Sequence, residues 1–161
     1  MKENVLKEGL MMGYIMELRK IVGSRPLLMV GTAVLVLDSE DRLLLQLRQD
    51  NGHWGLSGGS LELMESLEDA AGRELLEETG LTADNLEFFG LFSGEEFHYT
   101  YPHGDEVYNV IAAFLCRTYK GRLKPQTEEV AALRFFALDC LPEQISPPDL
   151  PIIKRFIEKH E

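Results

Sequence analysis

Three glutamates, Glu74, Glu77 and Glu78, lie close together in a segment that is predicted to be helical. Successive residues of a helix turn by about 100°, so residues three and four positions apart share one face. Carboxylates at this spacing repel each other by roughly a few tenths of a kcal/mol per pair in water. A divalent cation reverses the sign of that interaction, because carboxylate oxygens are ligands that Mg²⁺ prefers. Taken alone, the three glutamates are more typical of a solvated helix face.

The predicted helix, residues 66–79, has a start and a stop signal. Ser66 is a good N-cap residue, and Asp69 three positions later gives a weak form of the capping box. Gly80 is expected to be the C-cap. Arg73 lies four residues before Glu77 and is expected to pair with it. One helix face therefore carries three carboxylates and one neighbouring cation.

The surrounding residues follow a longer pattern. It runs glycine, five residues, Glu, seven residues, Arg-Glu, an aliphatic residue, any residue, Glu-Glu, any residue, glycine and an aliphatic residue. The matching positions are Gly59, Glu65, Arg73, Glu74, Leu75, Glu77, Glu78, Gly80 and Leu81. Every fixed position agrees, so the segment resembles the Nudix box, and the chain is identified as a member of the Nudix hydrolase family.

Positions outside the fixed pattern match the sequences of the family less completely. Residues 54–56, Trp-Gly-Leu, resemble the entry to the loop-helix-loop of the family. Ser57 stands where many members have proline, and Met64 stands where many have glycine. Neither position is fixed in the box, so the departures predict a different loop geometry and leave the expected catalysis intact.

The resemblance implies hydrolysis of a phosphoanhydride bond in a nucleoside diphosphate derivative or a nucleoside triphosphate, with Mg²⁺ or Mn²⁺ as cofactor. It implies that the metal ligands are Glu74, Glu77 and Glu78, with a backbone carbonyl of Gly58 or Gly59. Metal ions would neutralise the phosphates, orient a water in line and lower its pKa, and a carboxylate would take the proton.

Other roles follow from the same resemblance. Arg73 is expected to orient a glutamate through a salt bridge, and Glu65 to support the site indirectly or through a metal-bound water. The general base is either a box glutamate or one from a distant loop, where Glu128 and Glu129 precede a predicted strand. The alternative for that pair is two exposed loop glutamates.

Substrate contacts lack motif support. Arg48 follows a predicted strand and is a candidate for binding a phosphate. The candidates for stacking on a base are Trp54, Tyr99 and Tyr101. Surface or packing roles are the commoner alternative for all four residues.

A non-catalytic ligand sensor is the alternative function, although such domains usually lose a box carboxylate and this sequence retains all of them. A third possible function is that of a structural or interaction protein that keeps the fold without the activity.

The elements that position these residues alternate between strands and helices. Leu27 to Leu37 and Arg42 to Leu47 are predicted to be strands joined as a hairpin, and 51–59, with four glycines, is expected to be irregular. Further strands are predicted at 86–92, 106–119 and 130–138, a polar loop at 93–105, and an amphipathic helix through 152–157. This order predicts an α/β fold, and the resemblance implies a Nudix α/β/α sandwich with a central mixed β-sheet and flanking helices.

The N-terminal part of the chain is predicted to be separate from the catalytic domain. We expect a helical extension at 1–24 and a Nudix domain at 25–161. An apolar stripe through Met11, Ile15, Leu18 and Val22 is expected to dock either on this domain or on a second subunit, which leaves a homodimer open.

Charge and composition exclude several classes of partner. The 161 residues carry a formal net charge of -11, which would repel a nucleic acid polymer, and the longest uncharged run is too short to span a membrane. The two cysteines are too few for a disulfide scaffold, and no secretory signal is recognisable. The expected partner is a nucleotide-like small molecule, and the expected location is the cytoplasm.

Overall fold

The computed structural model describes residues 13–160, and the structural statements below concern these residues. The helices are α2 (Tyr14–Val22), the 3-10 helix η1 (Glu95–Phe97), α3 (Leu67–Thr79) and α4 (Leu150–His160). The strands are β1 (Leu27–Val36), β2 (Leu43–Arg48), β3 (Trp54–Gly55), β4 (Ser57–Ser60), β5 (Leu81–Ala83), β6 (Glu87–Phe92), β7 (His98–Thr100), β8 (Glu106–Cys116), β9 (Tyr119–Gly121) and β10 (Val130–Phe136).

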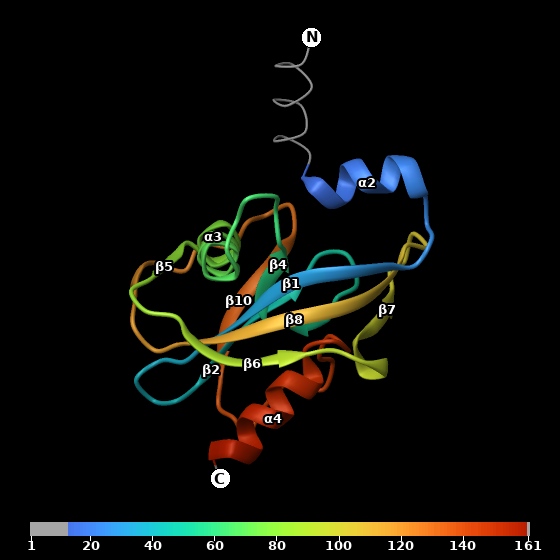
Figure 1. Ribbon diagram of the computed structural model, residues 1–161. Helices are drawn as coiled ribbons and strands as arrows, with labels where there is room; N and C mark the ends of the chain where they lie inside the picture. Colours follow the sequence, from blue (N-terminus) through green and yellow to red (C-terminus); the bar gives the residue numbers. More distant parts are fainter. Residues whose placement is uncertain (1–12, 161) are drawn as a thin grey trace.

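The central sheet is mixed. Its strand order is β4-β1-β8-β6, and β7 extends the edge by pairing with β8 (Figure 1). Strands β1 and β8 are parallel, and every other pair in this sheet is antiparallel. A three-stranded sheet, β10-β2-β3, and a two-stranded sheet, β5-β9, complete the strands. The predicted α/β fold with a central mixed sheet and flanking helices is confirmed.

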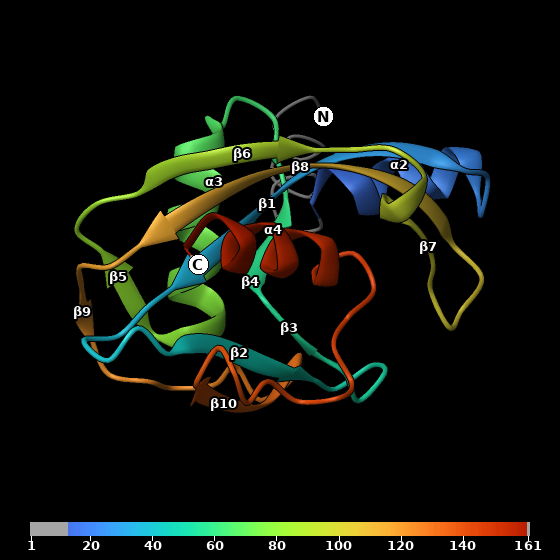
Figure 2. The same cartoon turned by 90° about the horizontal axis from the view of Figure 1, so that it is seen from below.

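Two helices cover opposite faces of the central sheet. Figure 1 shows α3 above the sheet and α4 below it, and Figure 2 shows α4 between the central sheet and the sheet of β2 and β10. Alternate side chains of a strand point to opposite faces, so Val34 and Val36 pack with Leu75 of α3, whereas Leu35 packs with Phe156 of α4. This burial on both faces explains the apolar run in the second half of β1, where residues 33–36 are all buried.

The predicted hairpin of residues 27–37 and 42–47 is wrong. Strands β1 and β2 lie in different sheets and share only an isolated bridge between Leu37 and Leu43. Both edges of β1 are already occupied, by β4 and by β8, so no edge is left for β2.

Two other segments also differ from the prediction. The glycine-rich segment 51–59 contains β3 and most of β4 instead of being irregular. Glycine permits this, because a Cβ atom on Gly58 would lie 2.0 Å from the carbonyl oxygen of Thr32 on β1. The loop at 93–105 includes β7, and the predicted long strand at 106–119 ends at Cys116.

The N-terminal stripe is only partly described. Ile15, Leu18 and Val22 lie on α2, whereas Met11 lies outside the described residues. No residue of α2 is fully buried, and polar contacts of Tyr14 with Glu62 and of Arg19 with Asp105 and Glu106 join the helix to its own domain. The boundary at residues 24 and 25 stays a prediction.

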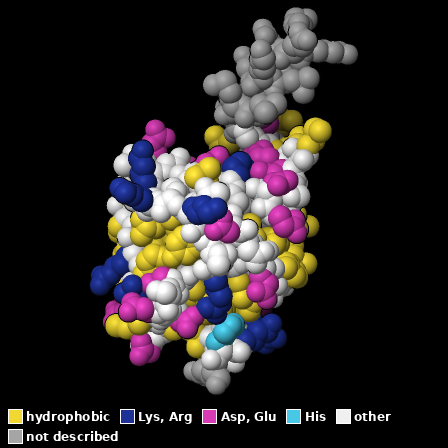
Figure 3. All heavy atoms as spheres, turned by 90° about the vertical axis from the view of Figure 1, so that its left-hand side faces the viewer, with side chains coloured by type: hydrophobic (Ala, Val, Ile, Leu, Met, Phe, Trp, Pro, Cys, Tyr) yellow, Lys and Arg dark blue, Asp and Glu magenta, His cyan; other side chains and the backbone are white. Residues whose placement is uncertain are grey.

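The surface carries both signs of charge. On the face shown in Figure 3, Lys and Arg side chains are dispersed among Asp and Glu side chains and apolar patches.

Both cysteines are unpaired thiols, with Cys116 buried and Cys140 exposed. Within residues 13–160, no helix has the length and apolar character needed to cross a membrane.

Candidate active site

Helix α3 positions the three glutamates through its caps and its buried face. The Ser66 hydroxyl accepts a hydrogen bond from the backbone N–H of Asp69 at 3.1 Å, and Gly80 ends the helix in the left-handed conformation, with φ of 78°. Ala71 and Leu75 are buried against the sheet. The predicted helix and both caps are confirmed. Because the apolar face of α3 packs on the sheet, the glutamates lie toward β4 and solvent.

Glu78 is the most buried of the three glutamates, with 5% of its surface exposed. Its Oε2 accepts hydrogen bonds from the Ser57 hydroxyl at 2.8 Å and from the Gly58 backbone N–H at 3.0 Å. Burial raises the pKa of Glu78 to about 8, because the charged form loses water. Strand β4 therefore holds a carboxyl group whose charge is poorly compensated.

Glu74 lies against the next residue of β4. A Cβ atom on Gly59 would be 2.3 Å from Oε1 of Glu74, so only glycine leaves room for this carboxylate. Burial is the largest cause of a raised pKa at Glu74, and the charge of Glu77 adds to it. Glu77 is the exposed member, with 53% of its side-chain surface accessible.

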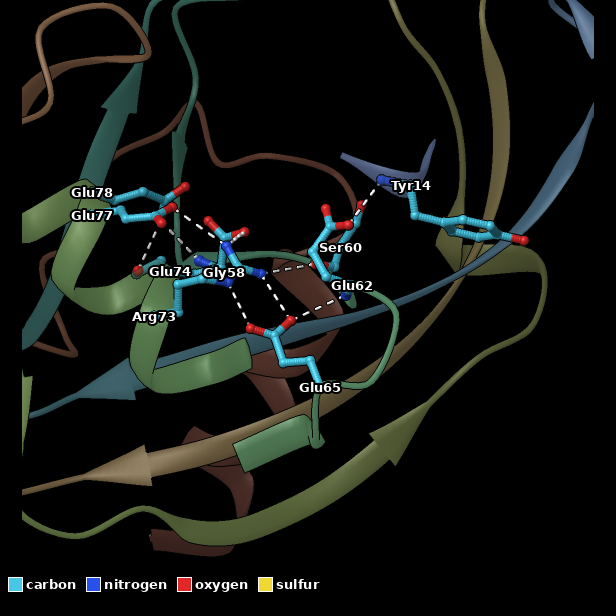
Figure 4. A network of polar contacts seen from close by, with 10 residues as sticks. Tyr14, Gly58, Ser60, Glu62, Glu65, Arg73, Glu74, Glu77 and Glu78 are labelled. Carbon is cyan, nitrogen blue, oxygen red and sulfur yellow. Dashed lines mark hydrogen bonds and ion pairs between the residues drawn. The ribbon is translucent and has the colours of Figure 1, made fainter. Parts of the chain in front are cut away.

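Arg73 joins the carboxylates into a network (Figure 4). Its guanidinium binds Glu65 with Nε at 2.6 Å and Nη2 at 3.0 Å, and its Nη1 lies 2.8 Å from Glu74 and 3.3 Å from Glu77. Nη2 also donates to the carbonyl of Ser60 at 3.2 Å. These bonds from Arg73 lower the pKa of Glu65. The expected pair of Arg73 with Glu77 is present but is longer than the pairs with Glu65 and Glu74.

A cleft of about 610 Å³ opens beside this network. Most of the residues that the sequence singled out line it, from α3, β2, β4, the loop between β7 and β8 and the loop before β10. They are Glu74, Glu77, Glu78, Gly58, Gly59, Arg48, Tyr101, Glu128 and Glu129. Within residues 13–160, no three Asp, Glu, His or Cys side chains converge as a ready-made metal site. Arg73 binds Glu74 and Glu77, whereas Glu78 is bonded to β4.

A smaller cavity of about 110 Å³ adjoins the cleft. Among its lining residues are Arg48, Tyr99, Tyr101, Asn109 and Asp149. Arg48 is held by two bonds to Asp50, at 3.0 and 2.8 Å. The Asp149 carboxylate accepts from the Leu56 backbone N–H at 3.1 Å, and desolvation raises the pKa of Asp149 to about 6.

The aromatic candidates separate in the structure. Tyr99 and Tyr101 line the smaller cavity and contact each other edge to face, with ring centroids 5.0 Å apart. Trp54 is not among the residues that line either cavity. It packs against Phe136 with ring centroids 4.9 Å apart, and its expected role in stacking on a substrate stays a prediction.

Among the polar residues that line these cavities, sequence reasoning missed Gln46, Asn109 and Asp149. Asp149 had a usable signal, because an aspartate directly before an amphipathic helix is a typical N-cap. Its backbone carbonyl accepts from Ile153, in keeping with that position. Gln46 and Asn109 sit within apolar strands, and nothing in their local sequence distinguishes them.

Comparison with known proteins gives a consistent result. Residues 27–156 match the family model described as the NUDIX domain. The chain is 44% identical over 69 residues to a MutT-like protein of Streptomyces ambofaciens, covering 43% of this chain and 45% of that protein. It is 32% identical over 95 residues to the NAD-capped RNA hydrolase NudC of Vibrio cholerae, covering 59% of this chain and 32% of that protein. The matches thus span less than half the length of these relatives.

A solved structure shares the fold. The crystal structure of a MutT NUDIX hydrolase from Burkholderia pseudomallei superposes with a TM-score of 0.68 at 24% identity. The superposition covers 80% of this chain and 97% of that chain. At this identity the likeness concerns the arrangement of helices and strands.

Proposed function

Because this chain belongs to the Nudix family, we propose that it is a divalent-metal-dependent hydrolase of a phosphoanhydride bond in a nucleotide derivative. The observation that most supports the proposal is the placement of Glu74 and Glu78 against the glycines of β4, inside a cleft of about 610 Å³. Ligand clefts of roughly 300–1,000 Å³ suit molecules of nucleotide size.

The residues present fit a divalent cation chemically. Glu74 and Glu78 have raised pKa values because burial leaves their charges without enough compensation, and a cation supplies that compensation. We assign Glu74, Glu77 and Glu78 as its ligands, with a backbone carbonyl of Gly58 or Gly59. Bound there, Mg²⁺ or Mn²⁺ supplies neutralisation of phosphate charge and a water of lowered pKa.

The chain's own residues then orient the site and move a proton. Arg73, itself held by Glu65, fixes the carboxylate of Glu74 in the cleft. Glu128 and Glu129 are exposed on the loop before β10, which also lines the cleft. A box glutamate or one of this pair accepts the proton of the attacking water. Arg48 lines both cavities and is assigned to bind a substrate phosphate.

We assign the smaller cavity to the nucleobase. Tyr99 and Tyr101 offer aromatic surface, whereas Asn109 and Asp149 offer hydrogen-bonding groups. The cavity shares Arg48, Gly58 and Gly59 with the cleft, so a base bound in it would place the attached phosphates toward the box.

The test is turnover with Mg²⁺ on a panel of ADP-ribose, nucleotide sugars, diadenosine polyphosphates and ordinary and oxidised nucleoside triphosphates. Phosphate is measured after a phosphatase coupling step. We expect metal-dependent turnover that falls by at least about a hundredfold in Glu78→Gln, which corresponds to about 3 kcal/mol. Glu158→Gln, an exposed change on α4, is the matched control and should keep full activity. Tight binding of one compound without turnover by the wild type would contradict the hydrolase and favour a ligand sensor.

A further inference from the structure

Helix α2 precedes the segment that matches the family model, yet it lines the same cleft as the box glutamates. Gly13, Ile15, Met16 and Arg19 contribute to the wall of the cleft. Figure 1 shows α2 above the start of β1, on the same side of the central sheet as α3. The cleft is therefore bounded by an element that the box does not include.

The N-terminus of α2 is held by a residue from inside the box. Gly13 provides no side-chain cap, and the backbone N–H of Tyr14 donates to Oε2 of Glu62 at 2.8 Å. A carboxylate at a helix N-terminus is favourable because of the helix dipole. The backbone N–H of Glu62 donates to Glu65 at 3.0 Å, and Glu65 binds Arg73 (Figure 4). A continuous polar link thus runs from α2 to the site.

The other end of α2 is held by Arg19. Its Nη2 donates to the carbonyl of Glu106 at 2.8 Å, and its Nε lies 3.4 Å from the Asp105 carboxylate. Nη1 donates to the carbonyls of Gly23 and Arg25. Only 11% of the Arg19 side chain is exposed. No residue of α2 is fully buried, so these polar contacts contribute to holding the helix in place.

The α2 end of the cleft differs chemically from the box end. Ile15 and Met16 lie there with the buried side chains of Met29 and Val107. The positive charge of Arg19 is already opposed by Asp105, and Glu62 adds a negative charge nearby. This end is thus suited to an uncharged organic group and disfavours a further phosphate.

We propose that α2 is a specificity element of the cleft, which binds an organic group attached to the second phosphate of a nucleoside diphosphate. The inference rests on the proposed function and deepens it. A substrate with organic groups at both ends of its diphosphate, such as ADP-ribose, contacts α2, whereas a nucleoside triphosphate such as ATP does not.

The test compares ADP-ribose with ATP in Met16→Trp. Met16 lines the cleft and is 59% exposed, so we expect the larger side chain to be accommodated without unfolding and to occupy part of the cleft. We expect the KM for ADP-ribose to rise by at least about tenfold while the kinetic constants for ATP change little. Ile21→Trp is the matched control, because Ile21 lies on the same helix, is 83% exposed and is not among the cleft-lining residues.

A second variant releases the helix rather than filling the cleft. Glu62→Ala removes the acceptor for Tyr14 and should also raise the KM for ADP-ribose selectively. Metal-dependent turnover in which Met16→Trp and Glu62→Ala alter both substrates equally, or neither, would overturn the role of α2 and leave the hydrolase standing. Absence of turnover on every nucleotide by the wild type would instead overturn the proposed function, and the inference with it.

Discussion

Ser57, one of the two departures from the family pattern, contacts a box glutamate directly. Where many members have proline, its hydroxyl donates to the buried carboxylate of Glu78 at 2.8 Å. A hydrogen bond to the charged form opposes the effect of burial on the pKa of Glu78. This residue therefore contributes to the electrostatics of the site through one side chain, without any change in the fixed positions of the box.

Met64, the other departure, holds the backbone under strain. Its φ is 67°, in the left-handed region that favours glycine, and its side chain is fully exposed. That conformation costs a non-glycine residue about 1–2 kcal/mol, and glycine adds about 0.5–1 kcal/mol of unfolded-state entropy. We expect Met64→Gly to raise the free energy of unfolding by about 0.5–1 kcal/mol, measured by urea denaturation.

Leu63 provides the control for that measurement. It is the preceding residue, is 71% exposed and is not among the residues with positive φ. Leu63→Gly should therefore lower the free energy of unfolding by about 0.5–1 kcal/mol. If both glycine substitutions lowered stability by the same amount, the strain at Met64 would be disproved.

At the scale of the element, β4 combines two neighbouring glycines with different tasks. A Cβ atom on Gly59 would collide with the Glu74 carboxylate, which is a flexible side-chain end. A Cβ atom on Gly58 would collide with the backbone carbonyl of Thr32, which cannot move without separating β4 from β1. Gly59 leaves space for the Glu74 carboxylate, and Gly58 lets β4 approach β1 closely.

The two alanine substitutions should therefore have opposite consequences. Gly59→Ala should keep a melting temperature near that of the wild type while turnover falls by at least about tenfold, because Glu74 is displaced. Gly58→Ala should lose about 1–3 kcal/mol of stability, because the backbone must shift. Thermal unfolding and the nucleotide assay, run on both variants, separate these outcomes. Equal loss of stability in both would argue against the distinction.

Sequence patterns predicted the features of this fold that depend on local contacts. Ser66 and Gly80 bound α3 as expected, because capping involves residues only a few positions apart. The hairpin prediction failed because the partners of β1 are decided by β8, about 80 residues away, and by β4. Likewise, spacing placed the box glutamates on one helix face and the resemblance to the Nudix box made them candidates, whereas Asp149 lines the adjoining cavity only through the packing of α4.

At the scale of the whole molecule, the cleft gathers segments that are remote along the chain. Helix α2, the box and the loop of Glu128 and Glu129 line it, and Asp149 lies in the adjoining cavity. Glu74, Glu78 and Asp149 all have raised pKa values because burial removes water from them. In a chain with a formal net charge of -11, this local excess of acid weakens the metal-free fold.

The stability of the metal-free protein should consequently fall as pH rises. Below their ordinary pKa values of 4.5 and 3.8, Glu78 and Asp149 are protonated in both the folded and the unfolded chain. Above those values the unfolded chain ionises first, so the folded state loses relative stability until pH about 6 for Asp149 and about 8 for Glu78. The melting temperature in EDTA should therefore decline between about pH 5 and 8.

Variants and metal separate this effect from general charge repulsion, which also grows with pH. Glu78→Gln should flatten the decline between about pH 6 and 8, where Glu78 alone of the two groups still titrates, and Asp149→Asn should flatten only the part below about 6. Mg²⁺ should raise the wild-type melting temperature most at the alkaline end, because a cation favours the ionised carboxylates. Parallel curves for the wild type and Glu78→Gln, with no greater effect of Mg²⁺ at high pH, would show that Glu78 does not titrate in this range.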